Sequence, residues 1–311
     1  MEKRYNAFTG YFREKYGCRL QKIVIDAGFT CPNRDGKVGR GGCTYCNNAA
    51  FHPNYSTPDK SITQQLDEGI EFHKGRYRNT HDYLAYFQSF SNTYAPLEHL
   101  KNIYSQALEH PLVKGIVVGT RPDCIDEEKL DYFQKLSEEK IVIIEYGIES
   151  CYNKTLRRIN RGHDFETAVK AVEATAARGI FQGAHFIFGL PGESLEQMRD
   201  TASIISGLPL NTVKFHQLQI IKGTAMEREF ETVPQDFVNF TLDGYIDFFI
   251  DFLERLRSDL YIERFAGEVP PRFVNHTPWG LIRNTELLRL LELRLQERNT
   301  WQGRLYARCG Q

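Results

Sequence analysis

Short apolar runs alternate with amphipathic segments along most of the chain. Residues 21–27 (QKIVIDA) form one such run, which ends at Gly28 and is typical of a buried strand. In residues 61–75 the apolar side chains recur at helical spacing, and Ser61 is a suitable N-cap. The predicted strands are 21–27, 83–90, 114–119, 140–147, 182–188 and 212–221, and the predicted helices among them are 61–75, 96–110, 126–138, 165–178 and 194–206.

This alternation predicts an α/β fold with six βα units over residues 21–258. Consecutive strands that are joined through helices run parallel, with right-handed crossovers. Six units are too few to close an eightfold barrel, so we expect a partial (βα)6 TIM-like barrel, with a doubly wound open sheet as the alternative. In both architectures, ligands bind at the carboxyl ends of the strands.

Two further regions flank this body. Residues 1–20 are rich in aromatic and basic residues and are expected to pack onto it as an N-terminal extension. A helical region is predicted over 236–258, followed by a loop-rich stretch with three prolines over 261–280 and a Leu/Arg-rich helix over 284–298. We therefore expect an extension, a barrel domain and a C-terminal loop-and-helix decoration: 1–20, 21–258 and 259–311.

The composition is ordinary for a soluble globular protein. Of 311 residues, 41% are apolar and 25% are charged, and the formal net charge is −1. The net charge therefore does not indicate a nucleic-acid-binding protein, although it is compatible with a local basic patch. No apolar run is long enough to span a membrane, and the N-terminal MEKRYNAFTGYF lacks the apolar core of a signal peptide. We expect a cytoplasmic protein with no membrane partner.

Three of the seven cysteines, Cys31, Cys43 and Cys46, fall within the sixteen residues CPNRDGKVGRGGCTYC. This glycine-rich, charged loop directly follows the first predicted strand, so it lies on the ligand-binding edge of the sheet. Three close thiolates make a site for a soft metal. A structural zinc would need a fourth ligand, for which His52 is the candidate. A [4Fe–4S] cluster held by three cysteines, with one iron open to a small ligand, fits the spacing best.

At this loop the sequence resembles the radical S-adenosylmethionine (SAM) superfamily, since an aromatic residue, Tyr45, precedes the last cysteine. The usual superfamily spacing is CxxxCx(aromatic)C after the first barrel strand. Here the first gap is widened to eleven residues, as in the subgroup that includes the elongator catalytic subunit. Within it, the chain is similar to the YtqA/YhcC-like family over about residues 5–290. The matching stretches are IDAGFTCPNRDG, GGCTYC, FQSFSNTYAP, GTRPDC, INRGHDF, FGLPGE and KGT.

The resemblance implies a radical SAM enzyme. Cys31, Cys43 and Cys46 would bind a [4Fe–4S] cluster, and SAM would bind the open iron through its amino and carboxylate groups. Reductive cleavage of SAM would yield methionine and a 5′-deoxyadenosyl radical that abstracts hydrogen from the substrate. The protein would hold SAM against the cluster and exclude water. A reductant such as flavodoxin or ferredoxin would supply the electron.

The resemblance also implies positions for SAM, which follow the strand ends. Tyr45 would lie beside the adenine, Glu149 and His185 would face the ribose, and Arg161 would meet the SAM carboxylate. The usual glycine-glycine-acid motif after the second strand is absent, which is a departure from the superfamily. Uncharged polar residues would bind the methionyl amine in its place. These are Gln88, Ser89, Ser91, Asn92 and Thr93.

Each of these positions also has a structural interpretation. Glu149 suits a helix N-terminus, Arg161 suits a solvated face, and His185 suits a hydrogen-bonded core position. Cys124 and Asp123 follow the third strand in GTRPDC, so they are candidates for substrate handling, with Cys124 as a hydrogen donor; the alternative is a small buried hydrophobe. Arg121 is a further substrate-pocket candidate, and Cys151 has the same two interpretations as Cys124. In the cysteine loop, Asn33, Arg34, Asp35 and Lys37 either shape the pocket or form a solvated excursion. No motif surrounds Cys18 or Cys309.

One candidate substrate is tRNA, because the resemblance links the family to wobble-uridine side-chain modification. Local support comes from a C-terminal arginine series with Trp301 and Tyr306 interleaved, which suits phosphate contacts and base stacking. The alternative is a neutralised, solvated face, since Glu286, Glu292 and Glu297 alternate with the arginines. A small-metabolite substrate, and a non-catalytic zinc or Fe–S barrel that serves as an interaction module, are also open. The arginines are Arg283, Arg289, Arg294, Arg298, Arg304 and Arg308.

Overall fold

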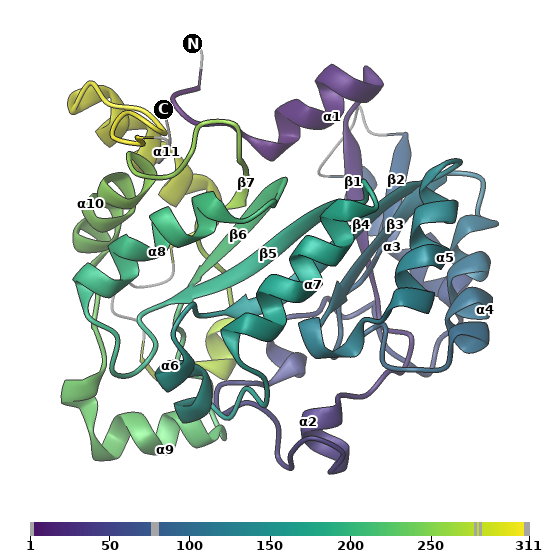
Figure 1. Ribbon diagram of the computed structural model, residues 1–311, viewed down its shortest axis with the longest axis horizontal. Helices are drawn as coiled ribbons and strands as arrows, with labels where there is room; N and C mark the ends of the chain where they lie inside the picture. The colour runs from purple at the N-terminus through teal and green to yellow at the C-terminus, as the bar shows by residue number, and fades with distance from the viewer. Residues whose placement is uncertain (1–2, 76–80, 277–278, 280–281, 308–311) are drawn as a thin grey trace.

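The computed structural model describes residues 3–75, 81–276, 279 and 282–307. Its centre is one sheet of seven parallel strands, in which the spatial order follows the chain order (Figure 1). The edge strands β1 and β7 do not pair with each other, so the sheet does not close into a full barrel. The strands are β1 (Leu20–Ile25), β2 (Asp82–Phe87), β3 (Val113–Thr120), β4 (Ile141–Glu149), β5 (Phe181–Phe188), β6 (Thr212–Gln217) and β7 (Tyr261–Arg264).

The sheet curls strongly, as an ion pair between its two edge strands shows. Lys22 on β1 lies 2.6 Å from a carboxylate oxygen of Glu263 on β7, although five strands separate them in the sheet. The predicted partial barrel is therefore confirmed. The open-sheet alternative is wrong, since the edges of an open sheet would lie far apart.

The seventh strand differs from the prediction, which left residues 261–280 in a loop-rich stretch. β7 adds to the sheet through the register pairs Thr212↔Tyr261 and Val213↔Ile262. It has four residues, and two of them are charged. Such a segment gives no apolar run by which a strand is recognised in sequence.

Helices cover the outer face of the sheet (Figure 1), and the main hydrophobic core lies between the two layers. The predicted cap is confirmed at Ser61, whose side chain accepts the backbone N–H of Gln64 at 3.1 Å. No helix among the described residues is both long and apolar enough to cross a bilayer. The helices are α1 (Phe8–Tyr16), α2 (Pro32–Asp35), α3 (Ile62–Lys74), α4 (Leu97–Leu108), α5 (Glu127–Ser137), α6 (Asn153–Arg158), α7 (Phe165–Ala177), α8 (Leu195–Gly207), α9 (Ala225–Thr232), α10 (Leu242–Leu253) and α11 (Asn284–Glu297), with short 3-10 turns η1 (Asn48–Ala50), η2 (Pro122–Cys124), η3 (Pro234–Asp236) and η4 (Pro271–Phe273).

The inner face of the sheet is filled in layers. At the amino ends of the strands, α1 inserts Phe8 and Phe12 against an apolar layer that includes Leu84 and Ile143. The next layer is charged, because Lys22, Glu145, Lys214 and Glu263 meet there. Lys214 binds Glu145 at 2.8 Å and Glu263 at 2.9 Å, and Lys22 contacts both acids as well. The lumen is thus closed at one end and polar toward the other.

Gly115 on β3 provides a test of this packing. A Cβ atom at this position would lie 2.0 Å from the backbone oxygen of Ile141 on the neighbouring strand. We expect Gly115→Ala to lower the free energy of unfolding by about 3 kcal/mol, because backbone in a central sheet cannot move aside. The matched control is Gly10→Ala in α1, where nothing lies within 4 Å, and which should stabilise by about 0.5–1 kcal/mol. Urea unfolding measures both, and equal stability of the two variants would contradict the strand pairing.

Candidate metal-cluster and cofactor site

The three cysteines lie in the loop that follows β1, at the carboxyl edge of the sheet (Figure 1). Cys31 is the N-cap residue of α2, and Cys43 and Cys46 follow after that helix. The loop is fixed on both sides by backbone hydrogen bonds. Thr44 donates its N–H to the carbonyl of Ile159 at 3.0 Å and accepts the N–H of Met226 at 2.9 Å. Chain segments far apart in sequence therefore position the cysteines.

The long insertion between the first two cysteines is partly structural and partly solvated. Asn33 is completely buried, and its amide donates to the carbonyl of Asn160 at 2.5 Å and to the sulfur of Cys43 at 3.7 Å. Asn160 donates in return to the carbonyl of Gly42 at 2.8 Å. Lys37 is exposed. The insertion thus orients Cys43 through Asn33, while its tip faces solvent.

Two arginines surround the thiols with positive charge. Arg161, only 6% exposed, directs one guanidinium nitrogen at the sulfur of Cys43, 3.4 Å away. Its other terminal nitrogen donates to the carbonyl of Gly147 at 2.6 Å. Arg34 donates to the carbonyl of Cys46 at 3.1 Å. Burial alone would lower the pKa of Arg34, but the hydrogen bond to Cys46 and the charges of all three cysteines raise it. Burial raises the pKa of the Cys46 thiol, and Arg34 and Arg161 oppose that shift by favouring the thiolate, the form that binds metal.

The arrangement does not form a site for a single metal ion. Among the described residues, no three His, Cys, Asp or Glu side chains are grouped so that they could hold one ion. His52 contacts the carbonyl of its neighbour Pro53 at 3.4 Å and lines a separate cavity. A Cys3His zinc set is therefore not present among these residues. A [4Fe–4S] cluster makes a different demand, because each cysteine binds its own iron and the thiols need not converge on one point.

Tyr45, Glu149 and Arg161, which were predicted to contact SAM, lie together beside Cys43. Glu149 ends β4 in the left-handed region at φ 73°, a conformation that is uncommon outside glycine. Its carboxylate lies 3.7 Å from the guanidinium of Arg161. Burial raises the pKa of Tyr45, and Cys43 and Glu149 add to this shift. The Nε of Arg161 is buried without a partner in the described structure, so the group still has a donor to offer.

The polar segment after β2 divides into two parts. Asn92 donates its amide to the carbonyls of Phe87 at 3.0 Å and Gly119 at 2.7 Å, and its side-chain oxygen is buried without a partner among the described residues. The hydroxyl of Thr93 bonds Thr120 and the carbonyl of Cys124. These two residues join the ends of β2 and β3. Gln88 lines a cavity on the open side of the sheet, between β1 and β7, whereas Ser89 and Ser91 are buried.

His185, which was predicted to face the ribose, contacts the charged layer of the lumen. Its Nε2 is 2.8 Å from a carboxylate oxygen of Glu145, in contact with the charged layer. Burial lowers the pKa of His185, and Lys214 adds to this effect. The residue is nevertheless the register partner of Gly147, whose carbonyl binds Arg161. It therefore lies one layer below the cysteine site.

The GTRPDC segment supports the site from the β3 side. Arg121, almost fully buried, forms a two-pronged ion pair with Asp123 at 2.8 and 2.7 Å and donates to the carbonyl of Arg161 at 2.8 Å. Asp123 thus positions the guanidinium of Arg121. Burial raises the pKa of the adjacent Cys124 thiol to about 11, so it is protonated at neutral pH.

The remaining cysteines lie apart from this cluster of residues. Cys151 is buried, and Cys18 is half-buried with its sulfur 4.0 Å from Asp82. Cys309 lies outside the described residues. Sequence reasoning did not single out His163, whose Nε2 is buried without a partner in the described structure and whose pKa is lowered to about 4 by burial and by Arg161. The signal in the sequence that pointed to His163 was its position in the INRGHDF stretch, two residues after Arg161.

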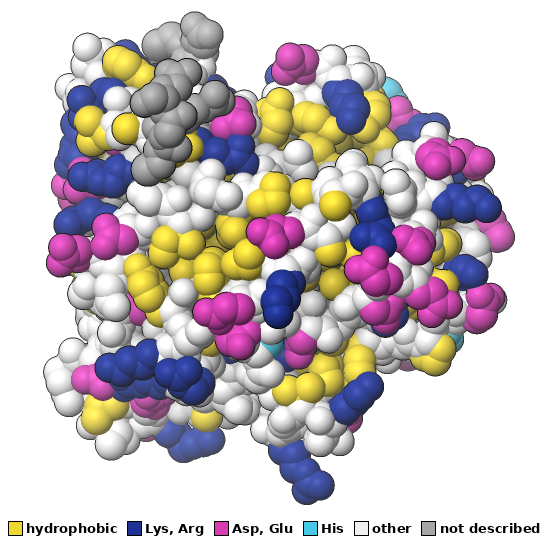
Figure 2. Space-filling view, viewed as in Figure 1, with side chains coloured by type: hydrophobic (Ala, Val, Ile, Leu, Met, Phe, Trp, Pro, Cys, Tyr) yellow, Lys and Arg dark blue, Asp and Glu magenta, His cyan; other side chains and the backbone are white. Residues whose placement is uncertain are grey.

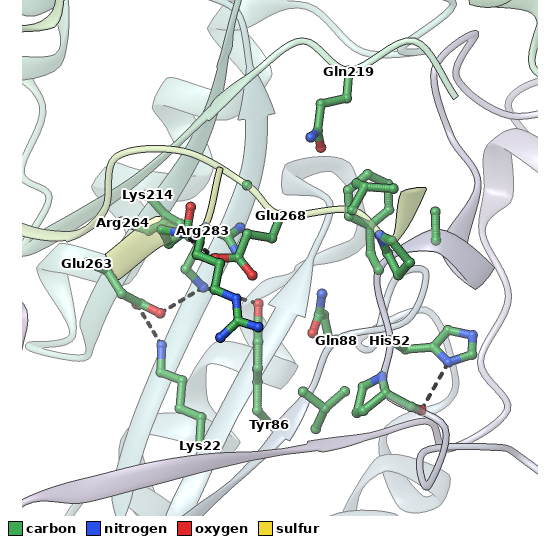
Figure 3. A pocket seen from close by; sticks show the side chains of 18 of the residues that line it. Lys22, His52, Tyr86, Gln88, Lys214, Gln219, Glu263, Arg264, Glu268 and Arg283 are labelled. Carbon is green, nitrogen blue, oxygen red and sulfur yellow. Dashed lines mark hydrogen bonds and ion pairs between the residues drawn. The ribbon is translucent and has the colours of Figure 1, made fainter. Parts of the chain in front are cut away.

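A cavity of about 800 Å³ opens on the uncovered side of the curled sheet, between β1 and β7 (Figure 3). Lys22, Lys214 and Glu263 form its floor, and Arg264 and Gln88 are on its walls. Gln88, directly after β2, and Gln217, at the end of β6, line the cavity and bring it to the carboxyl edge of the sheet. A substrate entering from the open side would therefore approach a cofactor held at the carboxyl edge.

The C-terminal arginines are largely neutralised, but only partly by the glutamates that the alternative interpretation named, since Glu292 pairs with Lys3. The acidic partners come from α11 itself and from α10, so these arginines join the two helices. Lys/Arg and Asp/Glu side chains are interspersed over most of the face in Figure 2. Arg283 is exposed and lines the cavity, and Arg308 is outside the described residues. The pairs are Arg289 with Glu286, Arg294 with Asp243, Asp247 and Glu297, Arg298 with Asp247 and Asp251, and Arg304 with Glu254.

A curled sheet with three cysteines after its first strand is the framework of one class of protein, and sequence comparison agrees. Residues 31–205 match the Radical SAM superfamily, and residues 210–297 match the Radical_SAM C-terminal domain. The chain therefore belongs to the radical SAM superfamily.

Individual relatives narrow this placement. The chain is 34% identical to the uncharacterized protein YtqA of Bacillus subtilis over 310 residues, covering 99% of this chain and 94% of YtqA. It is 36% identical to protein YhcC of Escherichia coli over 232 residues, 74% of each chain. These matches confirm the resemblance to the YtqA/YhcC-like family.

Two archaeal matches add weaker similarity. The structure of Elp3 from Methanocaldococcus infernus superposes with a TM-score of 0.68 at 15% identity, covering 91% of this chain and 64% of that one, which shows a shared fold. A stretch of 115 residues is 29% identical to a tRNA uridine(34) acetyltransferase of the same organism, covering 36% of this chain and 21% of that protein.

Proposed function

We propose that the protein is a radical SAM enzyme that binds a [4Fe–4S] cluster through Cys31, Cys43 and Cys46. The single observation that carries this proposal is the arrangement of these cysteines at the carboxyl edge of the sheet, with Arg161 directed at Cys43 and Arg34 beside Cys46. When bound, the cluster and SAM would supply a carbon-centred radical that abstracts hydrogen from the substrate. A small reductant protein such as flavodoxin or ferredoxin would supply the electron.

The residues present fit these cofactors. The unpartnered Nε of Arg161 and the unpartnered side-chain oxygen of Asn92 are a donor and an acceptor, which is the combination that a carboxylate and an ammonium group require. Glu149 presents a carboxylate beside Tyr45, which suits hydroxyl groups next to an aromatic base. The chain's own task is to orient SAM and keep water away from it.

For the substrate we propose the side chain of a tRNA wobble uridine. The partial similarity to a tRNA uridine(34) acetyltransferase supports this choice. The ion-paired arginines of α11 offer it little support, because their charge is already neutralised. The cavity on the open side is a better place for a nucleotide, since 800 Å³ is within the usual range for small-molecule sites.

Mass spectrometry of tRNA nucleosides tests the substrate. A strain that lacks this protein should accumulate a less modified wobble uridine, and restoring the wild-type chain should reverse the change. A chain with Cys43→Ala, expressed at the same level, should not restore it. An unchanged nucleoside profile in the deletion strain would overturn the tRNA proposal and favour a small-metabolite substrate.

Arg161→Gln is expected to weaken SAM binding by about 10-fold or more, because a charge-assisted hydrogen bond contributes roughly 1.5–3 kcal/mol. The matched control is Arg157→Gln, which removes an exposed arginine from the neighbouring helix α6 and should leave SAM affinity unchanged. Equilibrium dialysis with labelled SAM on the reconstituted protein measures both variants. Equal affinity of the wild type and Arg161→Gln would remove Arg161 from the SAM site.

A further inference from the structure

The cavity on the open side of the sheet carries an excess of positive charge. Five basic and two acidic side chains line it, in a chain whose formal net charge is −1. The acids are Glu263 and Glu268. The basic residues are Arg19, Lys22, Lys214, Arg264 and Arg283.

The acids near Arg264 are already engaged by other groups. Lys22 and Lys214 hold Glu263 on the cavity floor (Figure 3). The same two lysines also hold Glu145. Glu268 accepts the backbone N–H of Asn284 at the start of α11. Two lysines therefore offset two acids, and the third acid stabilises a helix start.

Arg264 is left without a carboxylate partner. Among the described residues none of its nitrogens lies within ion-pair distance of a carboxylate, and its Nε is buried and unpartnered. Its contact is the Nε2 of His216 on the adjacent strand β6. Burial and the Arg264 charge hold the pKa of His216 well below its ordinary value, so its ring is neutral and accepts the hydrogen bond.

His216 is itself fixed in place. A Cβ on Gly267 would lie 2.5 Å from its ring, so the backbone packs against one face. Gln217 exchanges two hydrogen bonds with the backbone of Gly267, at 2.9 and 3.0 Å, and this locks that contact. The ring centre of His216 lies 6.1 Å from that of His185, in the layer below the cysteine site. His216 is therefore held rigidly, and it orients the guanidinium of Arg264, which lines the cavity and has no carboxylate partner among the described residues.

We propose that Arg264, oriented by His216, binds an anionic group of the substrate, a phosphate or a carboxylate, inside this cavity. The proposal rests on the proposed function in that the cavity is taken as the substrate site. A planar guanidinium binds both anions through paired hydrogen bonds, and partial burial strengthens such contacts. Arg264 would therefore be a specificity-determining residue that positions the substrate within this cavity.

Binding of small probes to the anaerobically purified full chain tests this assignment. Uridine 5′-monophosphate against uridine reports a phosphate, and N-acetylglycine against N-acetylglycinamide reports a carboxylate. We expect the anionic member of one pair to bind at least about 10-fold more tightly than its neutral partner, and that pair identifies the source of the anion. Arg264→Gln should abolish the discrimination, and Arg264→Lys should retain part of it.

The matched control is Arg289→Gln on α11, which removes an exposed arginine that pairs with Glu286 and should preserve the discrimination. Thermal unfolding of each variant verifies that it is folded. Absence of discrimination in the wild type for both pairs, or its full retention in Arg264→Gln, would overturn the proposal. These measurements require no SAM cleavage, so their failure is distinguishable from failure of the proposed radical chemistry.

Discussion

Replacing Cys43 by alanine is expected to abolish cluster binding. Cys43 is the buried member of the three cysteines, and both Arg161 and Asn33 contact its sulfur. With two thiolates left, the cluster would lose one of its three protein ligands, and affinity for a metal centre depends on the number of ligands that hold it. We expect less than a tenth of the wild-type iron and sulfide content after anaerobic reconstitution, with loss of the visible charge-transfer absorbance.

Cys18→Ala is the matched control for that experiment. Cys18 is half-buried near the amino end of β1 and contacts Asp82, whereas the cysteine loop follows the carboxyl end of that strand. Its removal should leave iron content and absorbance unchanged. A Cys43→Ala protein that still carries four irons per chain would contradict the proposed ligand set.

Glu145→Gln is expected to lower the free energy of unfolding by about 3 kcal/mol or more. The Glu145 side chain is 1% exposed and contacts Lys22, Lys214 and His185 at once. Removing its charge would leave two lysines in the lumen with Glu263 as their remaining acid. The control is Glu98→Gln, which breaks an exposed pair with Lys101 on α4 and should leave stability unchanged. Urea unfolding at neutral pH compares the two.

The pH dependence of the same variant gives an independent check. Burial alone would raise the pKa of Glu145, but Lys214, Lys22 and His185 together outweigh it and hold the pKa well below its ordinary value. A depressed carboxyl pKa stabilises the fold above the unfolded-state value of about 4.3, and this contribution is lost as the pH falls toward the folded-state value. The stability difference between wild type and Glu145→Gln should therefore shrink on acidification below about pH 4. A constant difference there would contradict the buried pairing.

Much of the fold followed from periodicity, because buried parallel strands are apolar runs and the helices between them are amphipathic. β7 was missed because its charged residues face the lumen. The same signal was present in other strands, since Glu145, His185 and Lys214 interrupt otherwise apolar segments. Polar residues within a buried strand indicate a polar barrel interior.

The site was predictable in part. The cysteine spacing located the loop, and the resemblance brought Tyr45, Glu149 and Arg161 to one place, where the structure also has them. It could not distinguish Asn92 and Thr93 as residues that join two strands, since that depends on the distance between β2 and β3. The sequence also did not identify Arg264. An arginine that lacks a carboxylate partner can be recognised only when the positions of all neighbouring acids are known.

We propose that this chain holds a [4Fe–4S] cluster and uses it to cleave SAM. The most direct measurement is anaerobic reconstitution with iron and sulfide, followed by reduction with dithionite in the presence of SAM and chromatographic detection of 5′-deoxyadenosine. We predict cluster absorbance, about four irons per chain and 5′-deoxyadenosine that is absent from the Cys43→Ala protein. A preparation that binds zinc in place of the cluster, or that holds the cluster but never yields 5′-deoxyadenosine, would contradict the account.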